Sequence, residues 1–189
     1  QSTHVVSTWS ILMQAGATQI VANGIIRWVP PPNPLPWLAL AAVVGVAVFV
    51  AARSDRWGPV LAAVTAAAVA IDVAHALVAV IPASDSLAQT LLKIFAAGLV
   101  SVLAWVAGGV GAALLERRNP DGLFLAVFVA LILLLTGGLG DVTILGRSQI
   151  PYAVDPVIGR LLVSLTIGLA SGGLLSGIHA LRRIRPRLV

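Results

Sequence analysis

The sequence is poor in the residue types that usually carry chemistry. It has no cysteine among 189 residues, so disulfides, thiolate metal sites, iron–sulfur clusters and cysteine nucleophiles are excluded. Charged residues make up only 10% of the chain, against about 25% in an average soluble protein. The chain contains no G-x-S-x-G, no H-E-x-x-H and no phosphate-binding loop. These absences argue against an enzyme and against metal as a cofactor.

Apolar residues dominate what remains. They account for 59% of the chain, and the mean hydropathy is +1.01. A membrane-spanning helix needs roughly 20 apolar residues, and helices satisfy their own backbone in lipid. We therefore expect an all-α, polytopic transmembrane helical bundle that forms one integral membrane domain over 1–189. Its six helices, joined by short connections, are predicted at about 9–29, 36–53, 59–81, 87–115, 121–140 and 156–181.

The first of these segments is the most polar. Trp9 and Trp28 bracket it as interfacial tryptophans do, which favours a span packed inside the bundle. An amphipathic or re-entrant helix is the alternative, and the bundle then has five spans. The polar side chains of this segment are Gln14, Thr18, Gln19 and Asn23.

Five prolines from Pro30 to Pro36 follow the first segment. They predict a stiff, extended connector because proline fixes φ and lacks an amide hydrogen.

The basic residues cluster at the ends of apolar segments. The net charge of the chain is +5. The basic residues form no stripe interleaved with aromatic residues, so nucleic acid is not an expected partner. The positive-inside rule puts these clusters, and with them the C-terminus, in the cytoplasm. The dominance of Arg over Lys, together with abundant Ala and Val, suggests a bacterial cell (inner) membrane. The clusters are Arg53 with Arg56, Arg117 with Arg118, and Arg182, Arg183, Arg185 and Arg187.

Two ionisable residues interrupt the middle of the third segment. Asp72 and His75 are three residues apart on one helical face, with Thr65 two turns earlier on nearly the same stripe. A charge at that depth is costly, so both groups should face protein or water. Three interpretations are open: a proton or cation site, a buried polar pair that fixes helix register, and haem ligation by His75. The haem interpretation is the weakest because His179 lies near the cytoplasmic end and offers a poor second ligand.

Two cations near the outer end are candidate partners for Asp72. Lys93 lies two turns into the fourth segment and Arg160 one turn into the last. Their long side chains could reach the interface instead. Alternatively, they form an outward-facing polar vestibule above Asp72 together with Arg147, Asp85, Asp141 and Asp155.

Small residues recur at helical spacing in the fourth and last segments. Such spacing lets helix backbones approach closely in lipid. We expect packing within this chain, and packing against another subunit is the alternative. The residues are Ala104, Gly108 and Ala112 in the fourth segment, and Gly168, Gly172, Gly173, Ser176 and Gly177 in the last.

Taken together, these features favour a small non-catalytic integral membrane subunit that packs with other membrane protein subunits in a larger transport or bioenergetic complex. The alternative is a small transporter, channel or substrate-capturing membrane component that uses Asp72 and His75 as an intramembrane proton or cation site. An enzyme acting on lipid within the membrane is the least favoured hypothesis, because one Asp/His pair offers few groups for acid–base catalysis. No cofactor is expected, and the lipid bilayer is the one partner common to all three hypotheses.

Overall fold

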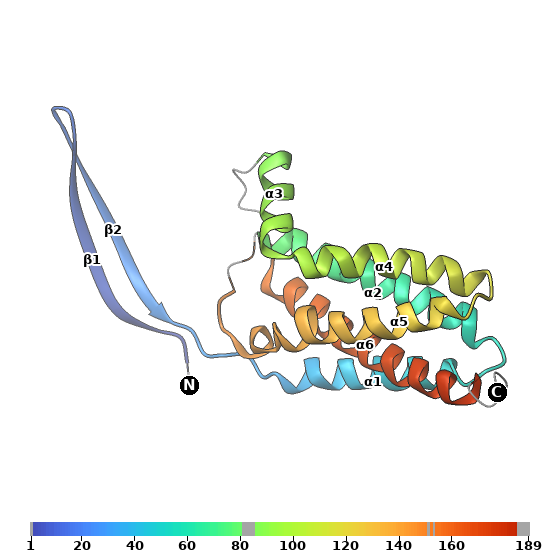
Figure 1. Ribbon diagram of the computed structural model, residues 1–189. Helices are drawn as coiled ribbons and strands as arrows, with labels where there is room; N and C mark the ends of the chain where they lie inside the picture. The colour runs from blue at the N-terminus through green and yellow to red at the C-terminus, as the bar shows by residue number, and fades with distance from the viewer. Residues whose placement is uncertain (1, 81–85, 151, 153, 185–189) are drawn as a thin grey trace.

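The computed structural model describes residues 2–80, 86–150, 152 and 154–184. It consists of a β-hairpin followed by a bundle of helices. Figure 1 shows the hairpin projecting away from one end of the bundle, with α1, α2, α4, α5 and α6 running alongside one another. The chain is therefore mostly helical, as predicted, but it is not a bundle of six spanning helices.

The segment predicted as the first span is the hairpin. Strand β1 (His4–Ala15) pairs with β2 (Thr18–Trp28) in antiparallel register, so that Trp9 lies opposite Gly24. Both strands are rich in the β-branched residues Val, Ile and Thr, which favour an extended backbone, and Gly16 makes the turn at φ +64°. The helical prediction for 9–29 is wrong because these β-branched residues and the turn at Gly16 outweigh the mean hydropathy.

One face of the hairpin is more apolar than the other, which mixes Ser10 and Gln14 with Leu12. Trp9, Ile11 and Met13 point to the same side of β1, because successive strand residues alternate between faces. The Trp9 ring lies over Gly24, where a Cβ would collide with it. Trp9, Ile11 and Met13 are all more than 40% exposed among the described residues.

The proline-rich connector leads into α1 (Leu35–Ala51), which carries Pro36 in its first turn. At 17 residues, α1 is shorter than the four helical stretches that are long and apolar enough to cross a membrane. It packs along α6 (Pro156–Ile184), and α6 is glycine-rich where the two helices meet. The prediction of a helix at 36–53 is confirmed to within about two residues.

The fourth predicted segment is two helices. Helix α2 (Trp57–Val80) is followed by α3 (Leu87–Ala97) and α4 (Leu99–Glu116), which are separated at Gly98. Gly98 leaves the helical conformation at φ −133° and ψ 33°, and α3 turns away from the line of α4 and projects from this end of the bundle (Figure 1). A single helix at 87–115 is therefore a wrong prediction. The exposed side chains of Leu87, Leu91 and Phe95 form one stripe on α3, an arrangement typical of helices that lie at a membrane surface.

The fifth segment changes its helical form before it ends. Helix α5 (Asp121–Leu133) continues into the π-helical η1 (Leu134–Leu139) and then the 3-10 helix η2 (Val142–Gly146). Asn119 caps α5 through the Asp121 amide at 2.9 Å, and Asp155 caps α6 through the Val157 amide at 2.7 Å. Each of these helices thus begins with a side chain that accepts a hydrogen bond from a backbone amide of its first turn.

Four helices in the described residues are long and apolar enough to cross a membrane. Their packed core contains the fully buried Leu61, Leu123, Leu133 and Val163. These helical stretches define a protein of membrane type. They are Trp57–Ala79, Leu99–Glu116, Asp121–Gly146 and Pro156–Arg183.

Candidate functional site

A cavity of about 520 Å³ opens where α2, the start of α4 and the π-helical η1 meet. Its apolar wall includes Ala76 and Leu99. Its polar wall consists of Asp72, His75, Ser101, Thr136 and Asp141. The cavity therefore reaches both ionisable residues that interrupt the third apolar segment, and it brings a second carboxylate to them.

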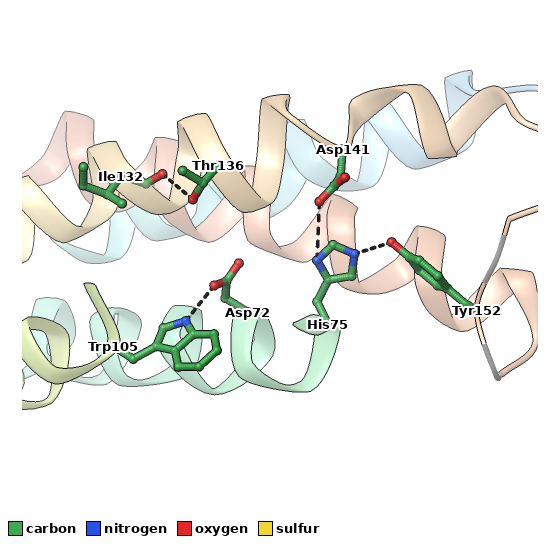
Figure 2. Close-up of polar contacts among 7 residues, drawn as sticks. All are labelled: Asp72, His75, Trp105, Ile132, Thr136, Asp141 and Tyr152. Atoms are coloured by element: carbon green, nitrogen blue, oxygen red, sulfur yellow. Dashed lines mark hydrogen bonds and ion pairs between the residues drawn. The ribbon is translucent and has the colours of Figure 1, made fainter. Parts of the chain in front are cut away.

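Asp72 is held by an indole and a glycine. Its side chain is only 3% exposed, and the Trp105 Nε1–H donates a hydrogen bond to its Oδ2 at 2.7 Å (Figure 2). The other oxygen, Oδ1, lies so close to Gly137 that a Cβ at that position would collide with it. The carboxyl group thus has a fixed position between α4 and η1.

His75 lies between a phenol and a carboxylate. It is 4% exposed, its Nε2 is 2.6 Å from the Tyr152 hydroxyl, and its Nδ1 is 3.8 Å from Asp141 Oδ2 (Figure 2). When the ring is neutral with its proton on Nδ1, Tyr152 donates to Nε2 and the Nδ1–H faces Asp141. When the ring is protonated, both N–H groups point at oxygens. The site can therefore hold His75 in either protonation state.

Tyr152 stays a phenol in this position. Burial raises the pKa of its hydroxyl well above the usual value, and the negative charge of Asp141 raises it further. The hydroxyl hydrogen therefore remains available to His75 across the physiological range. Tyr152 thus orients the imidazole ring.

The local folding of two elements explains why these groups meet. Asp72 and His75 are one turn apart on α2, so they share a face. In η1 the π-helical turn places two glycines, Gly137 and Gly138, in the core, and the wider turn is a form often found at functional sites. The Thr136 hydroxyl donates to the Ile132 carbonyl at 2.9 Å, which satisfies one acceptor of the altered ladder (Figure 2).

The other residues predicted for this site lie elsewhere. Thr65 is buried two turns below Asp72 and does not line the cavity. Lys93 is exposed on α3, and Arg160 is buried with its guanidinium donating to the Arg147 carbonyl at 2.9 Å. Neither cation lines the cavity. Asp141 is the one vestibule residue found there, Asp155 caps α6, and Asp85 lies outside the described residues.

The predicted small residues lie at helix contacts within the chain. A Cβ on Gly168 or Gly172 would lie 2.7 or 2.6 Å from a backbone carbonyl of α1. Gly173 faces Val64 and Ala130, and Gly177 faces Val127. The remaining four line buried contacts: Ala104, Gly108 and Ala112 on α4, and Ser176, whose hydroxyl donates to the Gly172 carbonyl at 2.7 Å.

Sequence reasoning missed three residues of the site: Trp105, Gly137 and Tyr152. Trp105 is the one tryptophan within a long apolar segment rather than at its edge, and an indole at that depth requires an acceptor for its N–H. That signal was present in the sequence. Tyr152 follows Pro151 in a loop and gave no such signal.

The described residues hold no group of three or more His, Asp or Glu side chains placed to bind a metal ion. His179 lies against Phe49, with ring centroids 6.2 Å apart, and does not line the cavity. The apolar helices indicate a membrane protein, and an open cavity between them is lined by Asp72, His75 and Asp141. No protein-family model, curated protein or solved structure matches the chain.

Proposed function

We propose that this chain is a membrane component that captures a proton or small cation at the Asp72–His75 site. The observation that carries the proposal is the cavity, because it gives a ligand access to two carboxyl groups and an imidazole among apolar helices. A buried polar pair that served only to fix helix register would need no such access. The geometry therefore favours capture over a purely structural role.

The charge of the site supports this proposal. Asp72 and Asp141 both line the cavity, whereas no Lys or Arg does so among the described residues. A carboxylate at this depth is unfavourable unless a proton or another positive charge accompanies it. His75 can supply one such charge when protonated. A cation entering the cavity would supply another.

The position of the cavity supports entry from one side. It adjoins Gly98, at the end of the bundle from which α3 and the hairpin project. The arginine clusters, as far as the structure describes them, lie at the opposite end of the helices. With the positive-inside rule, our proposal places the cavity toward the outer face of a bacterial inner membrane and the C-terminus in the cytoplasm.

Flux through reconstituted liposomes tests this function. The protein, Asp72→Asn and His75→Ala are compared for proton or monovalent-cation uptake under an imposed gradient. Asp121→Asn is the matched control, because Asp121 is exposed in the first turn of α5 and far from the cavity. We expect uptake to fall at least about tenfold in both cavity variants, because each loses a group that holds the proton or cation, and about 1.4 kcal/mol of lost binding free energy is tenfold. Unchanged flux in both variants would remove the proposal.

A second function, as a subunit of a larger membrane complex, is favoured by the hairpin. A two-stranded hairpin is marginally stable alone in water, and this one exposes an apolar face. The hairpin carries no charged residue from Val5 to Ile26. Its apolar face therefore fits a partner subunit that presents an uncharged apolar sheet face.

Two substitutions on opposite faces of β1 test this second function. Ile11→Lys places a charge on the apolar face, whereas Ser10→Lys places it on the other face. After extraction in mild detergent, we expect a stoichiometric partner to be lost from Ile11→Lys and retained by Ser10→Lys. Recovery of the unsubstituted chain as a monodisperse, self-sufficient protein would contradict the subunit role.

A further inference from the structure

A second cavity, of about 420 Å³, lies at the arginine-rich end of the bundle. Its walls come from the connection before α2, the first turn of α2, the end of α4 and the connection from α4 to α5. Arg56 and Arg118 line it from two different connections, and Trp57, Pro59 and Leu115 supply an aromatic and apolar side. Both arginines belong to the clusters that orient the chain by the positive-inside rule.

The two arginines are available to a ligand. In the part of the chain that the structure describes, neither guanidinium lies within ion-pair distance of a carboxylate. Asp55 also lines the cavity, so the lining has two positive charges and one negative. Planar guanidinium groups match the oxygens of a phosphate and bind them through paired N–H donors.

Arg118 occupies a position that ordinarily belongs to glycine. Helix α4 ends in a Schellman motif, in which the Arg118 amide donates to the Leu115 carbonyl at 3.0 Å and the Asn119 amide to the Leu114 carbonyl at 2.9 Å. In this motif the residue after the cap is left-handed and is usually glycine. Arg118 adopts this conformation at φ 58°, and it is the one non-glycine residue with positive φ in the described chain. The fold thus keeps an unfavourable backbone at the residue whose side chain lines the cavity.

The residues around Arg56 and Arg118 indicate that a phosphate bound between them would belong to a lipid headgroup. Trp57 is at the first residue of a candidate membrane span, and tryptophan gathers at the level of lipid headgroups. Basic pockets between membrane helices on the cytoplasmic side bind anionic headgroups. Apolar Pro59 and Leu115 beside the arginines would suit the glycerol and the start of an acyl chain.

We propose that this cavity binds the phosphate of an anionic phospholipid headgroup between Arg56 and Arg118. The site is independent of the Asp72–His75 cavity and of the function proposed for it. Asp55 limits the affinity of the site for an anion. Removing the Asp55 charge should therefore strengthen binding.

Native mass spectrometry of the detergent-solubilised full chain tests the proposal. Phosphatidylglycerol, phosphatidylcholine and inorganic phosphate are each titrated against the protein, Arg56→Gln, Arg118→Gly and Asp55→Asn. Arg117→Gln is the matched control, because Arg117 is an exposed neighbour that does not line the cavity. Each lost arginine should weaken phosphatidylglycerol binding about fivefold, which corresponds to about 1 kcal/mol per basic residue near anionic lipid.

Arg118→Gly separates binding from folding. Glycine relieves the left-handed backbone, so this variant should unfold at a higher denaturant concentration while it loses lipid affinity. Asp55→Asn should bind phosphatidylglycerol more tightly, and Arg117→Gln should change binding less than twofold. A purely structural Arg118 would not combine higher stability with weaker binding.

Comparing phosphatidylglycerol with inorganic phosphate identifies the source of the phosphate that the cavity binds. Displacement of phosphatidylglycerol by millimolar inorganic phosphate would support the phosphate site and show that the headgroup phosphate alone is recognised. Tight phosphatidylglycerol binding without such displacement would support a site that needs the whole lipid. Equal binding of phosphatidylglycerol and phosphatidylcholine, or equal losses in Arg118→Gly and Arg117→Gln, would overturn the proposal.

Discussion

Gly137 offers the sharpest test of how the Asp72 site is held together. In Gly137→Ala, the new Cβ would collide with Asp72 Oδ1, whereas its next side-chain neighbour, Thr166 Cγ2, is at an ordinary 3.5 Å. The carboxyl group must then move, or the π-helical turn must shift. Either movement weakens the hydrogen bond from Trp105 to Asp72 Oδ2.

The expected cost follows from three terms. Overpacking a buried site costs about 1–3 kcal/mol, and loss of one hydrogen bond to a carboxyl group costs about 1–2 kcal/mol. Replacing a helical glycine by alanine stabilises the helix by about 1 kcal/mol, which offsets part of this cost. We therefore expect Gly137→Ala to lower the free energy of unfolding by about 1–4 kcal/mol.

Unfolding in mixed micelles, followed by far-UV circular dichroism, measures this change. Gly109→Ala is the matched control, because a Cβ there would meet nothing within 4 Å, and it should be neutral or slightly stabilising. In an Asp72→Ala background the colliding oxygen is gone, so Gly137→Ala should cost little. Additive effects in this double-mutant cycle would refute our account of the site.

Three further outcomes are expected from unfolding measurements of the same kind. Trp105→Phe removes the donor to Asp72 and should cost about 1–2 kcal/mol; an unchanged stability would mean that this hydrogen bond does not hold the carboxyl group. Gly172→Ala places a Cβ 2.6 Å from the Gly45 carbonyl oxygen and should cost about 1–3 kcal/mol. Gly173→Ala, with no contact under 3.4 Å, should be tolerated, and the reverse order would contradict the observed α1–α6 contact. Asp155→Ala loses the cap on the Val157 amide and should cost about 1 kcal/mol, whereas Asp155→Ser should retain most of the stability.

The sequence predicted the helices where length and caps agreed. The ranges 59–81 and 156–181 correspond to α2 and α6, because apolar length and, for α6, the cap at Asp155 mark their bounds. The hairpin was missed because a mean hydropathy over many residues does not register the β-branched residues that favour a strand. The break at Gly98 was missed because a single glycine is tolerated in many membrane helices.

The candidate site was only partly readable from the sequence. The pairing of Asp72 with His75 follows from helical spacing alone. Their contacts do not, because Trp105 is 33 residues from Asp72 and Tyr152 is 77 residues from His75 along the chain. No local pattern encodes which helix faces which. Tertiary packing sets that choice.

The π-helical turn also has a consequence for how this chain tolerates changes of length. Each residue of an α-helix advances the side-chain direction by about 100°, and a π-turn absorbs roughly one additional residue. Deleting one residue from Leu134–Leu139 would therefore restore a regular α-helix and leave the side chains that follow in their present direction. Asp141 would still face the imidazole. In this region, the loss of one codon would keep the carboxylate beside its histidine and leave the bundle intact.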